Sequence, residues 1–228
     1  MRKNISICEA DSCFMCQNCL EEWRPAIFSG RKNLKLKKGE VLFKEGEPVT
    51  GVYFVYAGSM KVYKKWNEDK DLIIRFAKGG AMLGHRGLGN NFVYPISAAA
   101  LEPSTVCFID NKLFEATLKT NSGFASELLH FFAQELYESE KRMRNLVHMP
   151  VKSRVADALL HLKELFGETE AGFINTNLSR QDLASFAGAT YETVFRMINE
   201  LVKEKLIAVS GKSIAITNLR KLAKLAGR

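Results

Sequence analysis

The pattern of hydrophobic and polar positions changes twice along the chain. Over residues 34–110, short runs rich in Val, Ile, Phe and Tyr are separated by single or paired glycines. Glycines at such short intervals are typical of a meandering β structure that closes into a barrel or jelly roll. The runs 52–56 and 60–63 flank Gly58, which predicts a hairpin-like turn between two strands. This region is therefore expected to form a β domain.

A helical period follows the β region. One polar and five apolar side chains recur alternately three and four residues apart: Leu129, Phe132, Leu136, Ser139, Met143 and Leu146. This spacing predicts either a coiled-coil seam of about three heptads or a long helix packed on its own domain. Pro150 ends the run, because its ring removes a backbone donor and restricts the preceding residue. A new domain is expected to begin there.

The C-terminal part has the pattern of a helix-turn-helix. A first helix is expected from Val151 to Gly167. Ser179 and the carboxylate three residues later resemble a capping box at the start of a short helix. Gly188 supplies a turn, and Thr190 can cap a second helix. Two short helices joined by a turn that contains glycine make a helix-turn-helix.

The second helix of this pair is predicted to turn a chemically distinctive face outward. That face carries Tyr191, Glu192, Phe195, Arg196 and Asn199. In a DNA major groove, Arg196 can donate to guanine, Glu192 can accept from a cytosine amino group, and Phe195 can lie against a thymine methyl group. The alternative is that Glu192 and Arg196 form an ordinary i,i+4 surface pair. An exposed Phe195 argues against that alternative.

A hairpin is predicted behind the second helix. The apolar segments 206–209 and 213–216 flank Ser210-Gly211-Lys212. Glycine at the first turn position is typical of a two-residue hairpin loop. The hairpin would form a wing whose basic tip, at Lys212, suits contact with phosphate.

Composition and charge are consistent with a nucleic-acid partner. The 228 residues are 46% hydrophobic, enough for a core, and carry a net charge of +8 that attracts polyanions. No apolar run is long enough to span a bilayer, and the N-terminus lacks the apolar segment of a secretion signal. We expect a cytoplasmic protein with no membrane partner. The four histidines stand in unrelated contexts and no catalytic constellation is found, so we do not expect an enzyme.

The cysteines are the strongest candidates for a metal or redox site. Four of the five, Cys8, Cys13, Cys16 and Cys19, lie within a dozen residues, and Cys107 stands alone in a strand-like stretch. Thiolates at this spacing favour zinc or an iron–sulfur cluster. In a cytosolic chain, cysteines indicate metal binding or redox chemistry more than a disulfide framework. A zinc site, a cluster and a thiol redox switch are the three interpretations.

The order of these parts resembles the Crp/Fnr family of bacterial transcription regulators, from about Leu34 to the end of the chain. The matching motifs are Lys38-Gly39-Glu40-x-Leu42-Phe43-x-Glu45-Gly46, Val55-x2-Gly58, Ser179-Arg180-Gln181-Asp182-Leu183 and Glu192-Thr193-Val194-x-Arg196. The resemblance implies an α+β fold with four parts. These are a cysteine-rich segment (1–33), a β jelly-roll sensor domain of the cyclic-nucleotide-binding type (34–121), a long dimerisation helix (122–149) and a winged helix-turn-helix domain (150–228).

The resemblance also implies a homodimer that binds palindromic promoter DNA and works with RNA polymerase. Two recognition helices would enter successive major grooves about 34 Å apart. Glu192 and Arg196 would read bases, while Tyr191 and Phe195 would tune the preference. The full set of expected DNA-binding residues is Ser179, Arg180, Gln181, Thr190, Tyr191, Glu192, Phe195, Arg196 and Lys212.

Cyclic AMP is not expected as the effector. Cyclic-nucleotide binders of the family hold the ribose with a Gly-Glu pair and the phosphate with an Arg-Ser pair. Gly84-His85 and Ile96-Ser97 stand at the matching positions, so both charged partners are missing. A buried cyclic phosphate would lose its charge-assisted hydrogen bonds. Gly84, His85, Arg86 and Ser97 remain a candidate pocket for another anion, with a surface or structural role for the His-Arg pair as the alternative.

The Fnr-like branch of the family implies a [4Fe–4S] cluster. Cys107 follows Ala100-Leu101-Glu102, where Fnr-like proteins place their internal cluster ligand, and the other three ligands come from N-terminal cysteines. The alternative is that Cys107 is a small buried apolar residue. The Cys16-x2-Cys19 spacing is shorter than the family's usual spacing. Which three of Cys8, Cys13, Cys16 and Cys19 would bind is therefore open, and a zinc site that uses all four is the rival.

Overall fold

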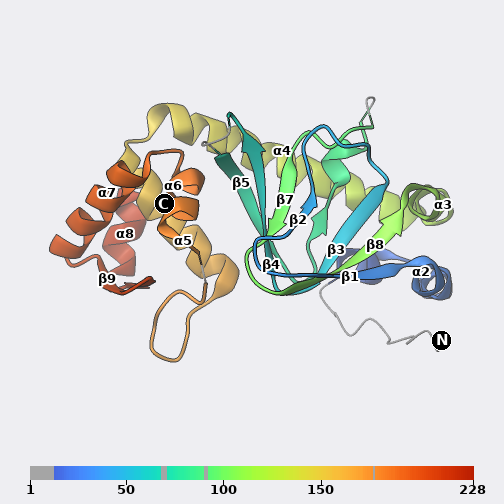
Figure 1. Cartoon of the computed structure of the whole chain (residues 1–228), viewed down its shortest axis with the longest axis horizontal. Helices are drawn as coiled ribbons and strands as arrows, with labels where there is room; N and C mark the ends of the chain where they lie inside the picture. Colours follow the sequence, from blue (N-terminus) through green and yellow to red (C-terminus); the bar gives the residue numbers. More distant parts are fainter. Residues whose placement is uncertain (1–12, 68–70, 90–91, 177) are drawn as a thin grey trace. The chain divides into compact units, whose positions relative to one another are not determined.

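The computed structural model describes residues 13–67, 71–89, 92–176 and 178–228, and Cys8 lies outside these ranges. These residues belong to two compact units (Figure 1). The first contains residues 13–65 and Arg75–Tyr137, and the second contains Trp66–Ile74 and Glu138–Arg228. None of the described helices combines the length and the apolar character needed to cross a membrane.

Two four-stranded sheets form the β sandwich. One sheet has the strand order β1-β8-β3-β6, and the other has the order β2-β7-β4-β5. The strands are β1 (Lys32–Leu36), β2 (Val41–Phe43), β3 (Gly51–Ala57), β4 (Ser59–Lys65), β5 (Asp71–Lys78), β6 (Met82–Leu83), β7 (Ser97–Ala100) and β8 (Ser104–Asp110). A short 3-10 helix, η2 (His85–Gly87), follows β6.

Strand β3 is buried on both faces, which explains why its sequence lacks a polar–apolar alternation. Val52 and Phe54 belong to a cluster that β3 shares with neighbouring helices. Tyr53 points to the other side, where its ring stacks on Phe43 of the second sheet with centroids 5.6 Å apart. A strand covered on both faces has a continuous apolar sequence.

The predicted hairpin around Gly58 is wrong, although both strands and the turn are present. Strand β3 pairs with β8 and β6, whereas β4 pairs with β7 and β5, so the chain crosses from one sheet to the other at Gly58. Gly58 has φ +85°, and a Cβ atom there would stand 2.4 Å from the Ser104 hydroxyl. Glycine is required at this corner for both reasons.

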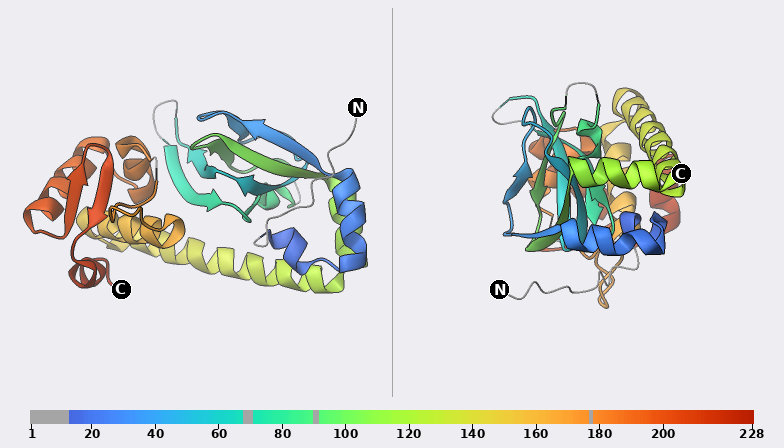
Figure 2. Two further views of the ribbon diagram at one scale, coloured as in Figure 1. Left: turned by 90° about the horizontal axis from the view of Figure 1, so that it is seen from below. Right: turned by 90° about the vertical axis from the view of Figure 1, so that its right-hand side faces the viewer.

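Helices lie along one side of the sandwich in the first unit. They are α1 (Phe14–Asn18), the 3-10 helix η1 (Glu21–Trp23), α2 (Arg24–Gly30), α3 (Asn111–Thr120) and the N-terminal part of α4 (Ser122–His148). Figure 2 shows the blue helices α1 and α2 beside α3 and the start of α4. Their apolar residues share one core cluster with β3 and β8, which brings the N-terminal segment against residues about 100 positions later.

The second unit contains the helix-turn-helix and the wing. Its elements are α5 (Val151–Phe166), α6 (Arg180–Ala187), α7 (Tyr191–Lys203), β9 (Ile207–Ser210), β10 (Ser213–Ile216) and α8 (Leu219–Leu225). Helix α5 ends at Gly167, which has φ +73° and so terminates the helix as expected. The predicted order of β sandwich, long helix and winged helix-turn-helix is confirmed.

The boundary between the units differs from the predicted segmentation. It falls inside α4, between Tyr137 and Glu138, and it assigns residues 66–74 to the second unit. The sequence placed one boundary at 121/122 and the next at 149/150. The cause is that α4 is a continuous helix whose last turns and the start of β5 both pack on α6, as described below.

Candidate DNA-binding surface and cysteine site

Local hydrogen bonds fix both helices of the helix-turn-helix. The Ser179 hydroxyl accepts from the Asp182 backbone N–H at 3.0 Å, and the Ser179 backbone N–H donates to the Asp182 carboxylate at 3.3 Å, which completes the predicted capping box. Gly188 ends α6 with φ +63°, and the Thr190 hydroxyl then accepts from the Thr193 N–H to cap α7. The turn therefore needs glycine, and the two caps set where each helix begins.

Helix α7 buries one face and exposes the other. Val194, Met197, Ile198 and Leu201 are buried, as their spacing predicted. The exposed face carries Tyr191, Glu192, Phe195, Arg196 and Asn199. Among the described residues neither Glu192 nor Arg196 has an ion-pair partner, so the simple surface pair does not form. Both side chains are available to a ligand.

The wing stands next to the first helix of the pair. Strands β9 and β10 pair from Ser210↔Ser213 onward, so the turn is the two-residue loop Gly211-Lys212, as predicted. Arg180 Nη2 donates to the Gly211 carbonyl at 3.5 Å. Lys212 and Gln181 are exposed, whereas Ser179 is already engaged in its cap. Lys212 thus extends from the tip of the wing, where a basic side chain can contact phosphate.

Arg142 on α4 is a contact residue that sequence analysis missed. Within the second unit its guanidinium donates to the carbonyls of Ile73 (2.5 Å), Ile74 (2.6 Å) and Phe186 (2.6 Å), and it lies 4.2 Å from the centroid of the Phe186 ring. Burial lowers the pKa of Arg142 to about 10. The neighbouring Ser185 hydroxyl donates to the Asp71 carbonyl. These bonds connect α6 to α4 and to the start of β5.

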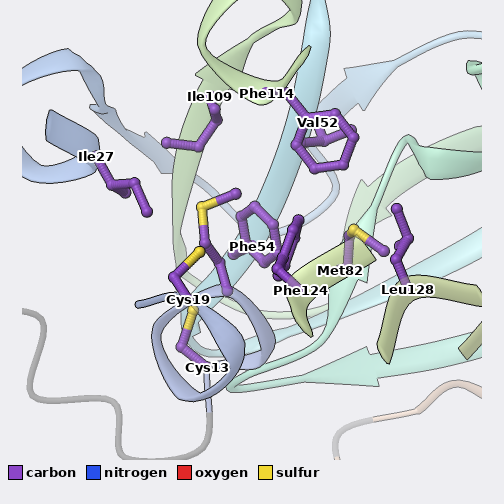
Figure 3. Close-up of a cluster of buried hydrophobic side chains, with 11 residues drawn as sticks. Cys13, Cys19, Ile27, Val52, Phe54, Met82, Ile109, Phe114, Phe124 and Leu128 are labelled. Atoms are coloured by element: carbon purple, nitrogen blue, oxygen red, sulfur yellow. The ribbon is translucent and has the colours of Figure 1, made fainter. Parts of the chain in front are cut away.

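The cysteine segment packs into the core of the first unit. Cys13 occupies the N-cap position of α1 without a side-chain cap hydrogen bond, Cys19 follows the C-terminus of α1, and both are 5% exposed. Figure 3 shows both side chains in the cluster that contains Phe54 and Phe124. Burial, with a contribution from Cys13, raises the pKa of the Cys19 thiol to about 11. Cys19 is therefore protonated at neutral pH unless a cation stabilises the thiolate.

Cys16 and Cys107 are partly buried and pack against the same cluster. Cys107 lies in β8, opposite Phe54 of β3, so the fold brings it to the region of the N-terminal cysteines. Within the described ranges, no three Cys, His, Asp or Glu side chains are close enough together to hold one metal ion. The type of donor and the shared location fit an iron–sulfur cluster or zinc, whereas the ligand geometry is not assembled.

Hydrogen bonds and rings attach the cysteine segment to the helices that follow the sandwich. Trp23 Nε1 donates to the Thr117 hydroxyl at 3.0 Å, and the Leu20 N–H donates to Asn121 Oδ1 at 2.9 Å. Phe14 packs against two rings of α4, Phe124 and Phe131, with centroids 5.7 and 5.3 Å apart. A rearrangement of α1 would therefore change the packing on the first turns of α4.

Two of the candidate effector residues already make contacts within the first unit. The Ser97 hydroxyl accepts from the Glu45 N–H at 2.9 Å, while His85 is 2% exposed and packs edge-on against Phe131 and Phe132. Gly84 has φ +81° and precedes η2. In the described part of the chain Nδ1 of His85 has no hydrogen-bond partner, and its Nε2 lies 3.6 Å from the Glu135 carboxylate. His85 is thus a buried residue, whereas the Arg86 side chain is 25% exposed.

Glu135 of α4 is the second contact residue that sequence analysis missed. Its carboxylate lies 2.9 Å from Arg86 Nη2, 3.6 Å from Arg75 Nη1 and 3.6 Å from His85 Nε2. Burial lowers the pKa of His85, so the imidazole is neutral. Burial alone would raise the pKa of Glu135, but His85 and the two guanidinium groups lower it to about 2. Two cations and one anion are thus held between η2, β5 and α4.

Comparison with known proteins assigns both units to families. Residues 33–121 match the cyclic nucleotide-binding domain, and residues 153–225 match the Crp-like helix-turn-helix domain. The transcriptional activator protein anr of Pseudomonas aeruginosa is 27% identical over 199 residues, which are 86% of this chain and 81% of the relative. The fumarate and nitrate reduction regulatory protein of Escherichia coli is 26% identical over 196 residues, 84% and 77% of the two chains.

Among solved structures, FixK2 from Bradyrhizobium japonicum superimposes with a TM-score of 0.76 at 26% identity, covering 86% of this chain and 96% of that one. The first of these relatives is named as a transcriptional activator and the second as a regulatory protein. The two matched domains, in this order and joined by a long helix, agree with the motifs found along the sequence. The chain belongs to the Crp/Fnr family of transcription regulators.

Proposed function

We propose that this regulator binds palindromic promoter DNA as a homodimer in the cytoplasm and responds to an iron–sulfur cluster or redox change at its cysteines. The observation that carries the DNA-binding part is the face of α7. It exposes Glu192, Arg196 and two aromatic rings together near the start of the helix. Recognition helices contact bases through their N-terminal residues. Glu192 and Arg196 have the donors and acceptors that distinguish C·G pairs in the major groove.

The proposed dimer rests on the apolar stripe of α4. Leu129, Leu136 and Met143 are 70%, 61% and 64% exposed, although they occupy the seam positions of the heptad pattern. The helix packs on its own unit through a different stripe, which includes Phe124 and Leu128. Exposed leucines at heptad spacing are stabilised when a second helix covers them. A second copy of this chain is the occupant that the family's architecture supports, with RNA polymerase as a further partner on promoter DNA.

The cysteine input is supported by donor chemistry and location. Cys107 and three of the N-terminal cysteines would hold a [4Fe–4S] cluster, which would supply sensitivity to oxygen or nitric oxide. Cys13, Cys16, Cys19 and Cys107 all lie in or against one core cluster. Because these side chains are not assembled for metal binding, ligation would require α1 to rearrange. Such a rearrangement would change the packing of α4, because Phe14 of α1 contacts Phe124 and Phe131 of α4.

The signal would then act as a population shift. Ligation at the cysteines favours one packing of α1 on α4, and loss of ligation favours another. The seam residues lie on the same helix as Phe124 and Phe131, so the two packings would differ in dimer affinity and therefore in DNA affinity. Coupling of this kind is typically worth about 1–3 kcal/mol.

Anaerobic purification followed by iron, sulfide and zinc analysis tests the input directly. We expect about four iron and four sulfide per chain, with visible absorbance that bleaches in air, and a loss of both in Cys107→Ser. Colourless protein with equimolar zinc that Cys107→Ser leaves unchanged would reject the cluster in favour of a zinc site. Selection of a palindrome from a random duplex library tests DNA binding separately, because it does not depend on the nature of the signal.

A further inference from the structure

Two exposed aromatic rings form a continuous apolar surface on α7. Tyr191 and Phe195 lie one helical turn apart and are 42% and 50% exposed. Their ring centroids are 6.3 Å apart and the ring planes are inclined by 13°. Such near-parallel rings hold each other in place, and the phenyl ring of Phe195 has no group that can hydrogen-bond to water. Covering this surface with apolar atoms removes it from water and therefore lowers the free energy.

The position of the two rings on α7 indicates which apolar atoms would cover them. Glu192 and Arg196 follow the two rings directly in the sequence and share their exposed face. A helix placed in the major groove to let these two side chains reach base edges would bring the rings to the same edges. Of the groups that base pairs display in that groove, the apolar one is the C5-methyl of thymine.

We propose that Tyr191 and Phe195 select thymines at two positions of each half-site through the C5-methyl groups. Successive bases of one strand are about 3.4 Å apart along the axis. Rings 6.3 Å apart can therefore face methyl groups up to two base steps apart. The inference rests on the proposed DNA-binding function and adds a sequence requirement to it. The half-site would combine a G or C read by Arg196 and Glu192 with thymines beside it.

Replacing thymine by deoxyuridine tests this inference, because the exchange removes the methyl group and keeps the pairing. A duplex selected from a random library is resynthesised with one deoxyuridine at a time, and Kd is measured by fluorescence anisotropy at one salt concentration. For wild type we expect about a fourfold loss at each of two thymines per half-site, the value of burying one methyl-sized group.

Variants assign each methyl to a ring. Phe195→Ala should bind more weakly and become indifferent to deoxyuridine at one position, and Tyr191→Ala should become indifferent at the other. Val202→Ala is the matched control, since Val202 is 38% exposed at the far end of α7. It should keep the wild-type response at both positions. If a ring only stabilised the helix, its replacement by alanine would weaken binding to the thymine and the deoxyuridine duplexes by the same factor.

Two results would overturn the inference. A defined selected site without any methyl-sensitive thymine would reject it and leave the DNA-binding function standing. Methyl effects that persist unchanged in both alanine variants would do the same. If no sequence were selected at all, the inference and the proposed function would fall together.

Discussion

Neutralising Glu135 should destabilise the first unit far more than neutralising another acid on the same helix. The carboxylate is 19% exposed and faces Arg75, Arg86 and His85, of which the His85 side chain is 2% exposed. In Glu135→Gln the guanidinium groups of Arg75 and Arg86 would keep their burial and lose their anion. The Arg75 guanidinium would keep its hydrogen bond to the Met82 carbonyl, but its Nε already lacks a hydrogen-bond partner among the described residues.

The magnitude follows from the pKa of Glu135. A pKa lowered from 4.5 to about 2 corresponds to roughly 3 kcal/mol, because each pH unit of displacement is worth about 1.4 kcal/mol. Breaking a buried ion pair from one side typically costs about 3–5 kcal/mol, which agrees. We expect Glu135→Gln to lower the free energy of unfolding of the first unit by about 3 kcal/mol. Because the first unit lies between the small and the larger size classes of domains, the Tm should fall by roughly 9–18 °C.

The pH dependence provides a second readout. Since the folded-state pKa of Glu135 lies below its unfolded value, the carboxylate's contribution is present above about pH 5 and is lost as the pH falls toward 2. The gap between wild type and Glu135→Gln should therefore be constant from pH 8 to 5 and narrow below 5. His85, whose pKa is lowered by burial, makes both proteins less stable as the pH falls below about 6.5.

Urea denaturation followed by circular dichroism, at pH 7.5 and at steps down to pH 4, measures both effects. Glu127→Gln is the control, since Glu127 lies on the same helix with its side chain 52% exposed. It should stay within about 0.5 kcal/mol of wild type. Equal stability of the two glutamine variants at pH 7.5, or a stability gap that does not narrow below pH 5, would contradict this role of Glu135.

Three further predictions concern α4 and the helix-turn-helix. Leu136→Glu should give monomers in sedimentation velocity, because it charges the exposed seam, whereas His130→Glu, charged on another side of α4, should sediment as the dimer. Arg142→Met leaves three carbonyls without their donor and should lower the free energy of unfolding of the second unit by about 3 kcal/mol. Thermal denaturation measures this loss, and Arg144→Met, at an exposed position on the same helix, should change it little. Ser179→Ala removes the capping box and should cost about 1 kcal/mol, and an unchanged melting curve would show that the cap is dispensable.

Local patterns predicted most of the second unit because its signals are local. The Ser179 cap, the Gly188 turn and the Gly211 hairpin each depend on residues within a few positions of one another. The exposed face of α7 followed from helical spacing alone. The order of the larger parts was likewise visible from the change of period and from the family's motifs.

Contacts between residues far apart in the sequence could not be predicted from local patterns. The crossing at Gly58 depends on Ser104, and Arg142 binds carbonyls about 70 residues away, which no spacing reveals. Glu135 left a weak signal that could have been used. It continues the stripe of Phe124, Leu128 and Phe131 at helical spacing, and a lone carboxylate on an otherwise apolar stripe indicates a buried partner.

The DNA affinity of anaerobic and air-exposed protein tests the central claim most directly. Kd for the selected palindrome is measured for wild type and Cys107→Ser under both conditions at one salt concentration. We predict that air weakens wild-type binding about tenfold, within the usual range of coupling between two sites, and that Cys107→Ser binds weakly under both conditions. Equal affinities in all four measurements would contradict control of DNA binding by the cysteine site.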